Sequence, residues 1–187
     1  MNSFKNPLLW ATLLFLAAAI YVSRGGLSGP ANDPGFITAE ELGNLPVGLK
    51  VAHEPEVALA TEIGRSASPA KYRWWYKTTV SAIGGEVTIV EFGALAWHDG
   101  RWVTGGSITE RPYTAKEFAD WYSCPNAVIK PGETYSDPTT WSSSSELLAE
   151  KSRWYYIGVD GSGRRVKGEA IVEQRAEIDP KRPKDPE

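Results

Sequence analysis

The segment EVTIVEFGALAWHDGRWV, residues 86–103, constrains the fold more than any other part of the chain. It places Asp99-Gly100 between two apolar runs, and Asp-Gly is a preferred pair for a two-residue type I′ turn. With this turn, Trp97 and Trp102 face each other in the closer, non-hydrogen-bonded kind of cross-strand pair. The sequence therefore predicts a β-hairpin in which Asp99, Gly100, Trp97 and Trp102 have structural roles.

The stretch KYRWWYKTTV, residues 71–80, predicts a strand with one buried and one exposed face. Alternation with a period of two places five residues on the core face: Tyr72, Trp74, Tyr76, Thr78 and Val80. Arg73, Trp75 and Lys77 fall on the opposite, solvated face. An indole between two cations on that face either packs under the cations or contacts another molecule. Trp75, Arg73 and Lys77 are therefore the candidate partner-binding residues of the domain.

Short strand patterns separated by turn residues continue to about residue 176. One short helix is predicted where Thr114 and Glu117 fit a capping box and Cys124-Pro125 ends the helical pattern. Over residues 70–175 the pattern is similar to that of immunoglobulin-like and fibronectin-like domains, without the paired cysteines of antibody domains. The resemblance implies a mainly β fold, an antiparallel β-sandwich with one short helix.

The N-terminus carries an uncharged apolar run from Pro7 to Val22. As a helix these sixteen residues span about 24 Å, which is enough to cross a bilayer if flanking residues such as Trp10 lie at its interfaces. A cleaved signal peptide is the alternative, with Ala17 and Ala19 before the cleavage point. Because residues 20–22 extend the apolar run, we expect a retained anchor.

These patterns divide the chain into five parts. In order they are a short cytoplasmic N-terminus (1–6), a single transmembrane anchor or uncleaved signal (7–22), a Pro/Gly-rich linker (23–46), an extracytoplasmic β-sandwich domain (47–176) and a disordered charged tail (177–187). The expected location is the bacterial inner membrane, with the domain in the periplasm or extracytoplasmic space.

Composition argues against several classes of function. The net charge of −3 and a pI near 5.5 provide no basic field for binding nucleic acid. Two histidines, His53 and His98, one cysteine, Cys124, and a sole methionine at position 1 do not supply a copper site, and no cofactor or metal is expected. The sequence also lacks a recognisable nucleophile motif, so we expect no enzyme, with an exported hydrolase as the alternative.

Two functions fit these observations. The first is a non-catalytic accessory or structural subunit that binds an integral-membrane protein complex, contacts the lipid bilayer through its N-terminal helix, and has Trp75, Arg73, Lys77 and Trp10 as contact residues. A bacterial respiratory or photosynthetic complex is a host of this kind. The second is an exported module that binds carbohydrate or cell-wall material on a strip of exposed aromatic residues, for which the candidates are Trp75, Trp102, Trp141 and Trp154.

Overall fold

A computed structural model describes residues 35–64, 69–104 and 111–184 of this protein. Within these ranges the chain is mainly β, as predicted, with two α-helices and one 3₁₀ turn. In chain order the elements are α1 (Ala39–Asn44), β1 (Leu49–Glu54), β2 (Val57–Glu62), β3 (Tyr72–Ala82), β4 (Val87–His98), β5 (Arg101–Thr104), β6 (Tyr113–Thr114), α2 (Ala115–Tyr122), η1 (Pro125–Ala127), β7 (Val128–Ile129), β8 (Thr134–Ser144), β9 (Glu150–Asp160) and β10 (Arg165–Ile178).

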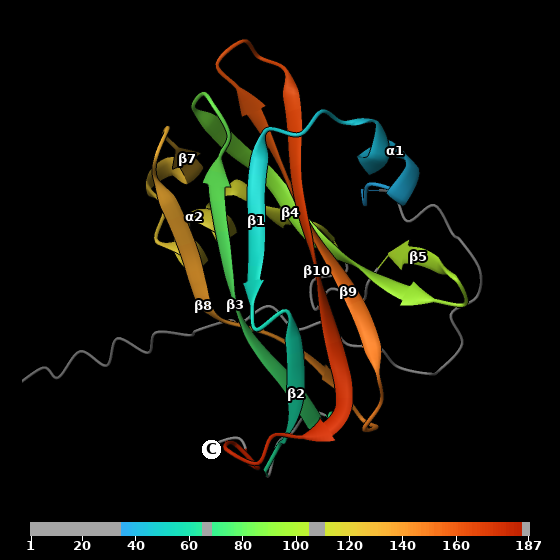
Figure 1. The fold of residues 1–187 in the computed structure, drawn as a ribbon. Helices are drawn as coiled ribbons and strands as arrows, with labels where there is room; N and C mark the ends of the chain where they lie inside the picture. The colour runs from blue at the N-terminus through green and yellow to red at the C-terminus, as the bar shows by residue number, and fades with distance from the viewer. Residues whose placement is uncertain (1–34, 65–68, 105–110, 185–187) are drawn as a thin grey trace, which may run out of the picture.

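The strands of the described ranges form one hydrogen-bonded sheet that is open and curled (Figure 1). Its order is β1-β3-β2-β10-β9-β4-β5, with β8 paired to β3, and β6 and β7 paired to β4. Only the pair of named strands β2 and β10 is parallel in the described residues. The predicted sandwich of two sheets is not confirmed. Long strand β3 pairs with both β1 and β2 along one side, which joins segments that a sandwich would divide between two sheets.

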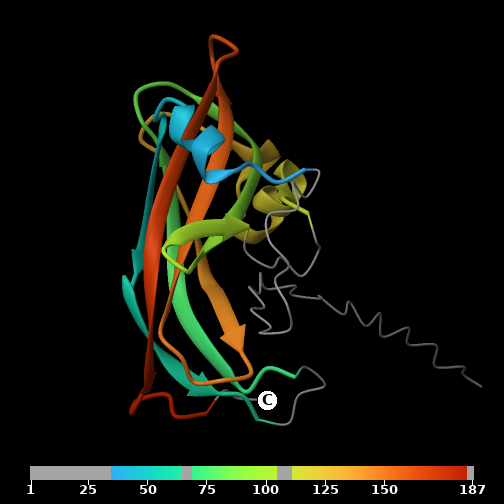
Figure 2. The same cartoon turned by 90° about the vertical axis from the view of Figure 1, so that its right-hand side faces the viewer.

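The concave side of the sheet holds the larger core, built from aromatic side chains around α2. Phe92 of β4 stacks on Tyr156 of β9 with ring centroids 5.4 Å apart, and Phe118 of α2 meets Phe92 edge to face. Helix α2 contacts both β4 and β8, strands that lie far apart in the sheet order, so it fills the curl between them (Figure 2). Aromatic side chains therefore fill the concave side of the curled sheet.

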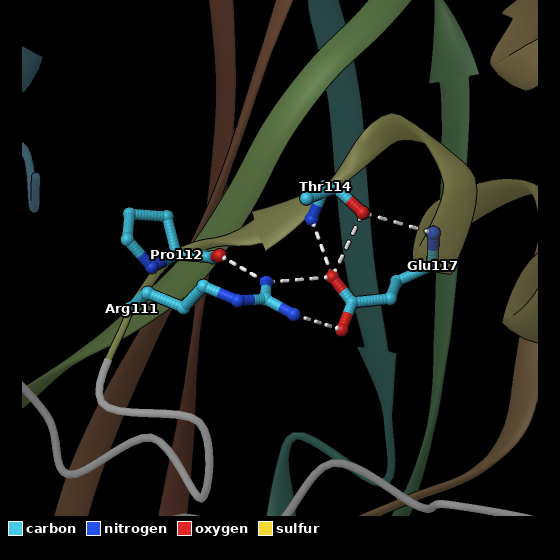
Figure 3. A network of polar contacts seen from close by, with 4 residues as sticks. All are labelled: Arg111, Pro112, Thr114 and Glu117. Atoms are coloured by element: carbon cyan, nitrogen blue, oxygen red, sulfur yellow. Dashed lines mark hydrogen bonds and ion pairs between the residues drawn. The ribbon is translucent and has the colours of Figure 1, made fainter.

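The predicted capping box starts α2, and the structure adds an arginine to it (Figure 3). The Thr114 hydroxyl accepts a hydrogen bond from the backbone N–H of Glu117, and the Glu117 carboxylate accepts one from the backbone N–H of Thr114 at 2.7 Å. Arg111 donates two hydrogen bonds of 2.9 Å to the same carboxylate. Although partial burial opposes it, this set of donors lowers the pKa of Glu117, so the capping residue is anionic at neutral pH.

The opposite, convex side of the sheet is termed the outer face, and α1 covers part of it. Leu42 of α1 is fully buried against Leu95, Tyr155 and Ile157. This helix lies within the predicted linker 23–46, and the apolar residues at 37, 39, 42 and 45 pack on the sheet. The physical reason is the amphipathic character of this short helix, which buries one leucine through a single helical turn.

The C-terminal segment also differs from the predicted tail at 177–187. Strand β10 extends to Ile178, and the residues that follow lie alongside β2. The backbone N–H of Asp179 donates to the carbonyl of Ala60 at 2.8 Å, and that of Glu62 donates to the carbonyl of Pro183 at 3.2 Å. Unpaired backbone groups on β2 thus order a proline-rich segment that would form no ladder by itself.

In the ranges that the structure describes, no helix has the length and apolar character needed to cross a bilayer. The predicted cytoplasmic N-terminus 1–6, the predicted anchor 7–22 and Trp10 lie outside these ranges.

Candidate functional site

Two tryptophans and two arginines form a cluster on the outer face of β3 and β8. Trp75 and Trp141 lie directly opposite each other across the two strands, with ring centroids 6.3 Å apart and planes inclined by 59°. The Arg73 guanidinium carbon lies 4.2 Å from the Trp141 ring and 5.0 Å from the Trp75 ring. Arg182, from the segment alongside β2, reaches 5.9 Å from Trp75. We call these four residues the Arg–Trp cluster.

The alternation of β3 places this cluster as the sequence predicts. Trp74 and Tyr76 are buried in the concave core, where the indole of Trp154 donates to the Tyr76 hydroxyl at 2.7 Å. Trp75 and Arg73 are partly buried on the other side of the strand. Within the described ranges, the Trp75 indole N–H is buried and donates to no acceptor. Desolvating an indole N–H without a hydrogen bond is unfavourable, and the contacts of this ring with Trp141 and with the two arginines oppose that cost.

The predicted members and the observed members of the cluster differ in part. The structure joins Trp75 and Arg73 as expected, whereas Lys77 is exposed and lies opposite Glu54 of β1. From the sequence, Trp141 is a candidate only for carbohydrate binding, and Arg182 falls in the predicted disordered tail 177–187. Neither the polar segment around Trp141 nor the proline-rich segment around Arg182 has a local pattern that predicts these positions.

The Trp97–Trp102 contact predicted for the hairpin is confirmed. The two residues are opposite each other in the β4–β5 ladder, and their rings meet edge to face with centroids 5.1 Å apart. Asp99 and Gly100 have φ of 48° and 77°, the positive values that a type I′ turn requires. Arg153 of β9 lies over the Trp102 ring at 4.3 Å, so the hairpin is also held against the sheet.

A shallow groove on the outer face begins at this hairpin. Its volume is about 510 Å³, and its apolar lining comes from Trp97, Trp102, Ile171 and Val57. Trp97 and Ile171 are each 43% exposed. The groove shares no residue with the Arg–Trp cluster, and its lining residues on named strands come from β2, β4, β5, β9 and β10 rather than from β3 or β8.

The titratable groups considered for metal binding or catalysis do not come together. In the residues that the structure covers, no group of three or more His, Cys, Asp or Glu side chains is arranged to hold a metal ion. His53 is buried beside Thr78, whereas His98 is exposed at the hairpin turn, near Asp99. Burial raises the pKa of the Cys124 thiol to about 11, and this thiol donates to the carbonyl of Val128.

Comparisons with known proteins give only a distant likeness. No protein-family model matches this chain. A search of curated proteins also finds no match. Among solved structures, the chain is similar to a crystal structure of a Bordetella pertussis protein assigned as ApaA, with 14% identity, a TM-score of 0.39, and coverage of 68% of this chain and 94% of that chain. At this level of similarity, the likeness supports no inference about the function of this chain.

Proposed function

We propose that this protein is a non-catalytic, single-pass accessory subunit of the bacterial inner membrane. In this proposal residues 7–22 anchor it, and the β domain on the extracytoplasmic side binds and stabilises a larger membrane protein complex, such as a respiratory or photosynthetic one. The observation that carries the proposal is the Arg–Trp cluster, in which Arg73 lies over both Trp75 and Trp141 on the face that points away from the concave core.

Tryptophan and arginine are the residue types that contribute most at protein interfaces. Arg73, Trp75 and Trp141 of this cluster are held on two paired strands, so little of their side-chain freedom remains to be lost when a partner binds. These features support a protein contact at this position.

The arrangement gives less support to the carbohydrate-binding alternative. A sugar platform needs several aromatic rings that present open, roughly coplanar faces. Here the rings of the Trp75–Trp141 pair are inclined by 59° and those of the Trp97–Trp102 pair by 66°, and Arg73 lies over the first pair. Trp154, a further candidate, is 1% exposed in the core.

Affinity purification of the tagged full-length chain from native membranes in mild detergent, followed by mass spectrometry, tests this function. We expect an integral-membrane complex in stoichiometric amount, and an intact mass of the chain that includes residues 7–22. Trp75→Ala should reduce recovery of that complex by an amount equivalent to about 2 kcal/mol of binding, which is roughly thirtyfold in affinity.

Trp97→Ala is the matched control, because it removes an exposed tryptophan from the other side of the outer face. It should leave recovery of the complex unchanged. If the Trp75→Ala chain recovered as much of the complex as the wild type does, the Arg–Trp cluster would be rejected as the contact. A mature N-terminus near Ile20 would reject the anchor and favour a soluble binding module.

A further inference from the structure

The part of the outer face that α1 leaves uncovered carries an ordered pattern of charge around the groove. Lys151 of β9 and Glu173 of β10 are opposite each other in the antiparallel ladder and form an ion pair of 2.7 Å. Both side chains are about half exposed, at 49% and 46%. Along the same two strands, Arg153 lies opposite the exposed Ile171. The surface therefore has an apolar centre and charges of both signs in neighbouring strands.

This pattern is complementary to itself. A two-fold axis that runs along the strands, midway between β9 and β10, would place β9 of one copy over β10 of a second copy. Lys151 would then face Glu173 of the second copy, and Glu173 would face its Lys151. Arg153 would face Ile171 of the second copy, so that no residue meets a like charge on the stretch of these strands that α1 leaves uncovered. Interfaces with two-fold symmetry require a surface of this kind.

The strands on either side of β9 and β10, which are β4 and β2, are brought together by the same axis. Strand β4, which carries Trp97, neighbours β9, whereas β2 neighbours β10. The axis would bring Trp97 of one copy toward Glu56 and Val57, which line the far side of the groove in the other copy. An exposed indole would thereby gain an apolar contact and an anionic acceptor. A strongly charged partner would find no such match, because the groove is lined by two cations, Lys151 and Arg153, and by two anions, Glu56 and Glu173.

We propose that the outer face around the groove is a homodimer interface, in which two copies of this chain pack through β9 and β10 with Lys151 of each copy against Glu173 of the other. The contact has paired charges next to the axis and an exposed tryptophan against Val57 on each flank, so it combines charge pairing with aromatic contact residues. It uses a surface separate from the Arg–Trp cluster, so it does not depend on the proposed function.

Charge reversal in the full-length chain, measured by sedimentation in detergent, tests the dimer. Lys151→Glu alone and Glu173→Lys alone each create like-charge contacts across the axis, and each should weaken self-association by about tenfold or more. Mixing the two variant chains places opposite charges at both contacts, so the mixture should regain dimers that contain one chain of each kind. Trp97→Ala should also weaken the dimer by about tenfold.

A second measurement identifies the surface. A chain with Lys151→Cys mixed with a chain with Glu173→Cys should give a disulfide-linked pair under mild oxidation. Lys116→Cys, at an exposed position of α2 on the concave side, should give none with either. Monomeric wild-type protein would overturn the proposal, and so would dimers that survive each single charge reversal unchanged. Trp75→Ala should leave the dimer intact. Failure of the proposed membrane-complex contact can therefore be told apart from failure of the proposed dimer.

Discussion

The hydroxyl groups of Tyr122 on α2 and Tyr156 on β9 lie 2.5 Å apart in the buried core, which ties the helix to the centre of the sheet. Burial raises the pKa of both tyrosines, so both hydroxyls remain neutral and form an ordinary hydrogen bond. The neighbouring Tyr155 points to the outer face, and in the described ranges its buried hydroxyl has no hydrogen-bond partner. Adjacent residues thus carry one satisfied and one unsatisfied buried hydroxyl.

Replacing each of these tyrosines by phenylalanine should therefore give different results. Tyr156→Phe leaves Tyr122 without its partner and should lower the free energy of unfolding by about 1 to 2 kcal/mol. Tyr155→Phe removes a hydroxyl that is desolvated without compensation, so it should be neutral or stabilising. Chemical denaturation of the two variants measures the difference. Equal losses in both would contradict the contrast between the two hydroxyls.

The buried imidazole of His53 should make stability depend on pH. Its Nε2–H donates to the carbonyl of Ala170, and its Nδ1 accepts from the hydroxyl of Thr78 at 3.0 Å, which fits a neutral ring. Burial lowers the pKa of His53 to about 4, although the carbonyl contact opposes this shift. In the unfolded chain His53 is therefore protonated as the pH falls through about 6.5, whereas in the folded chain it stays neutral until the pH falls to about 4.

The contribution of His53 to stability is accordingly complete above pH 6.5 and declines as the pH falls toward 4, by up to about 3 kcal/mol. His53→Gln should abolish this part of the pH dependence in denaturation curves, while the exposed His98→Gln should preserve it. If stability fell with pH as steeply in His53→Gln as in the wild type between these pH values, the effect would belong to other groups.

The turn of the β4–β5 hairpin should depend on glycine at position 100. Gly100 has φ of 77°, where a β-branched residue is strained, and a side chain there would otherwise meet open space. Gly100→Val should cost about 1 to 3 kcal/mol. Gly161, in the β9–β10 turn, also faces open space but lacks a positive φ, so Gly161→Val should cost much less. Similar melting temperatures for the two variants would contradict the turn assignment.

The α2 cap should depend on the Glu117 carboxylate that Figure 3 shows between Thr114 and Arg111. Glu117→Ala removes a capping acceptor and the partner of Arg111, and should lower the free energy of unfolding by about 1 to 2 kcal/mol. Lys116→Ala, which breaks only the exposed ion pair with Asp120, is the control and should leave the melting temperature nearly unchanged. Equal sensitivity at both positions would show that the cap has no special role.

Features set by residues close together in the chain were predictable from the sequence. Asp99-Gly100 predicted its turn and the Trp97–Trp102 contact, because a two-residue loop fixes the register of both strands. Thr114 and Glu117 predicted the start of α2. Alternation in residues 71–80 correctly separated the buried Trp74 from the outward-facing Trp75, because side chains of a strand alternate whatever the strand pairs with.

Only the tertiary structure decided which segments meet. Alternation specifies the buried side of a strand and not its neighbour, so it fits a curled single sheet as well as a sandwich. The pairing of β3 with β1, β2 and β8 selects the single sheet. The same pairing brings Trp141 to Trp75, and the backbone of β2 brings Arg182 to them. These contacts join residues distant in the chain, and their free energy comes from burial and hydrogen bonds that exist only after the strands have assembled.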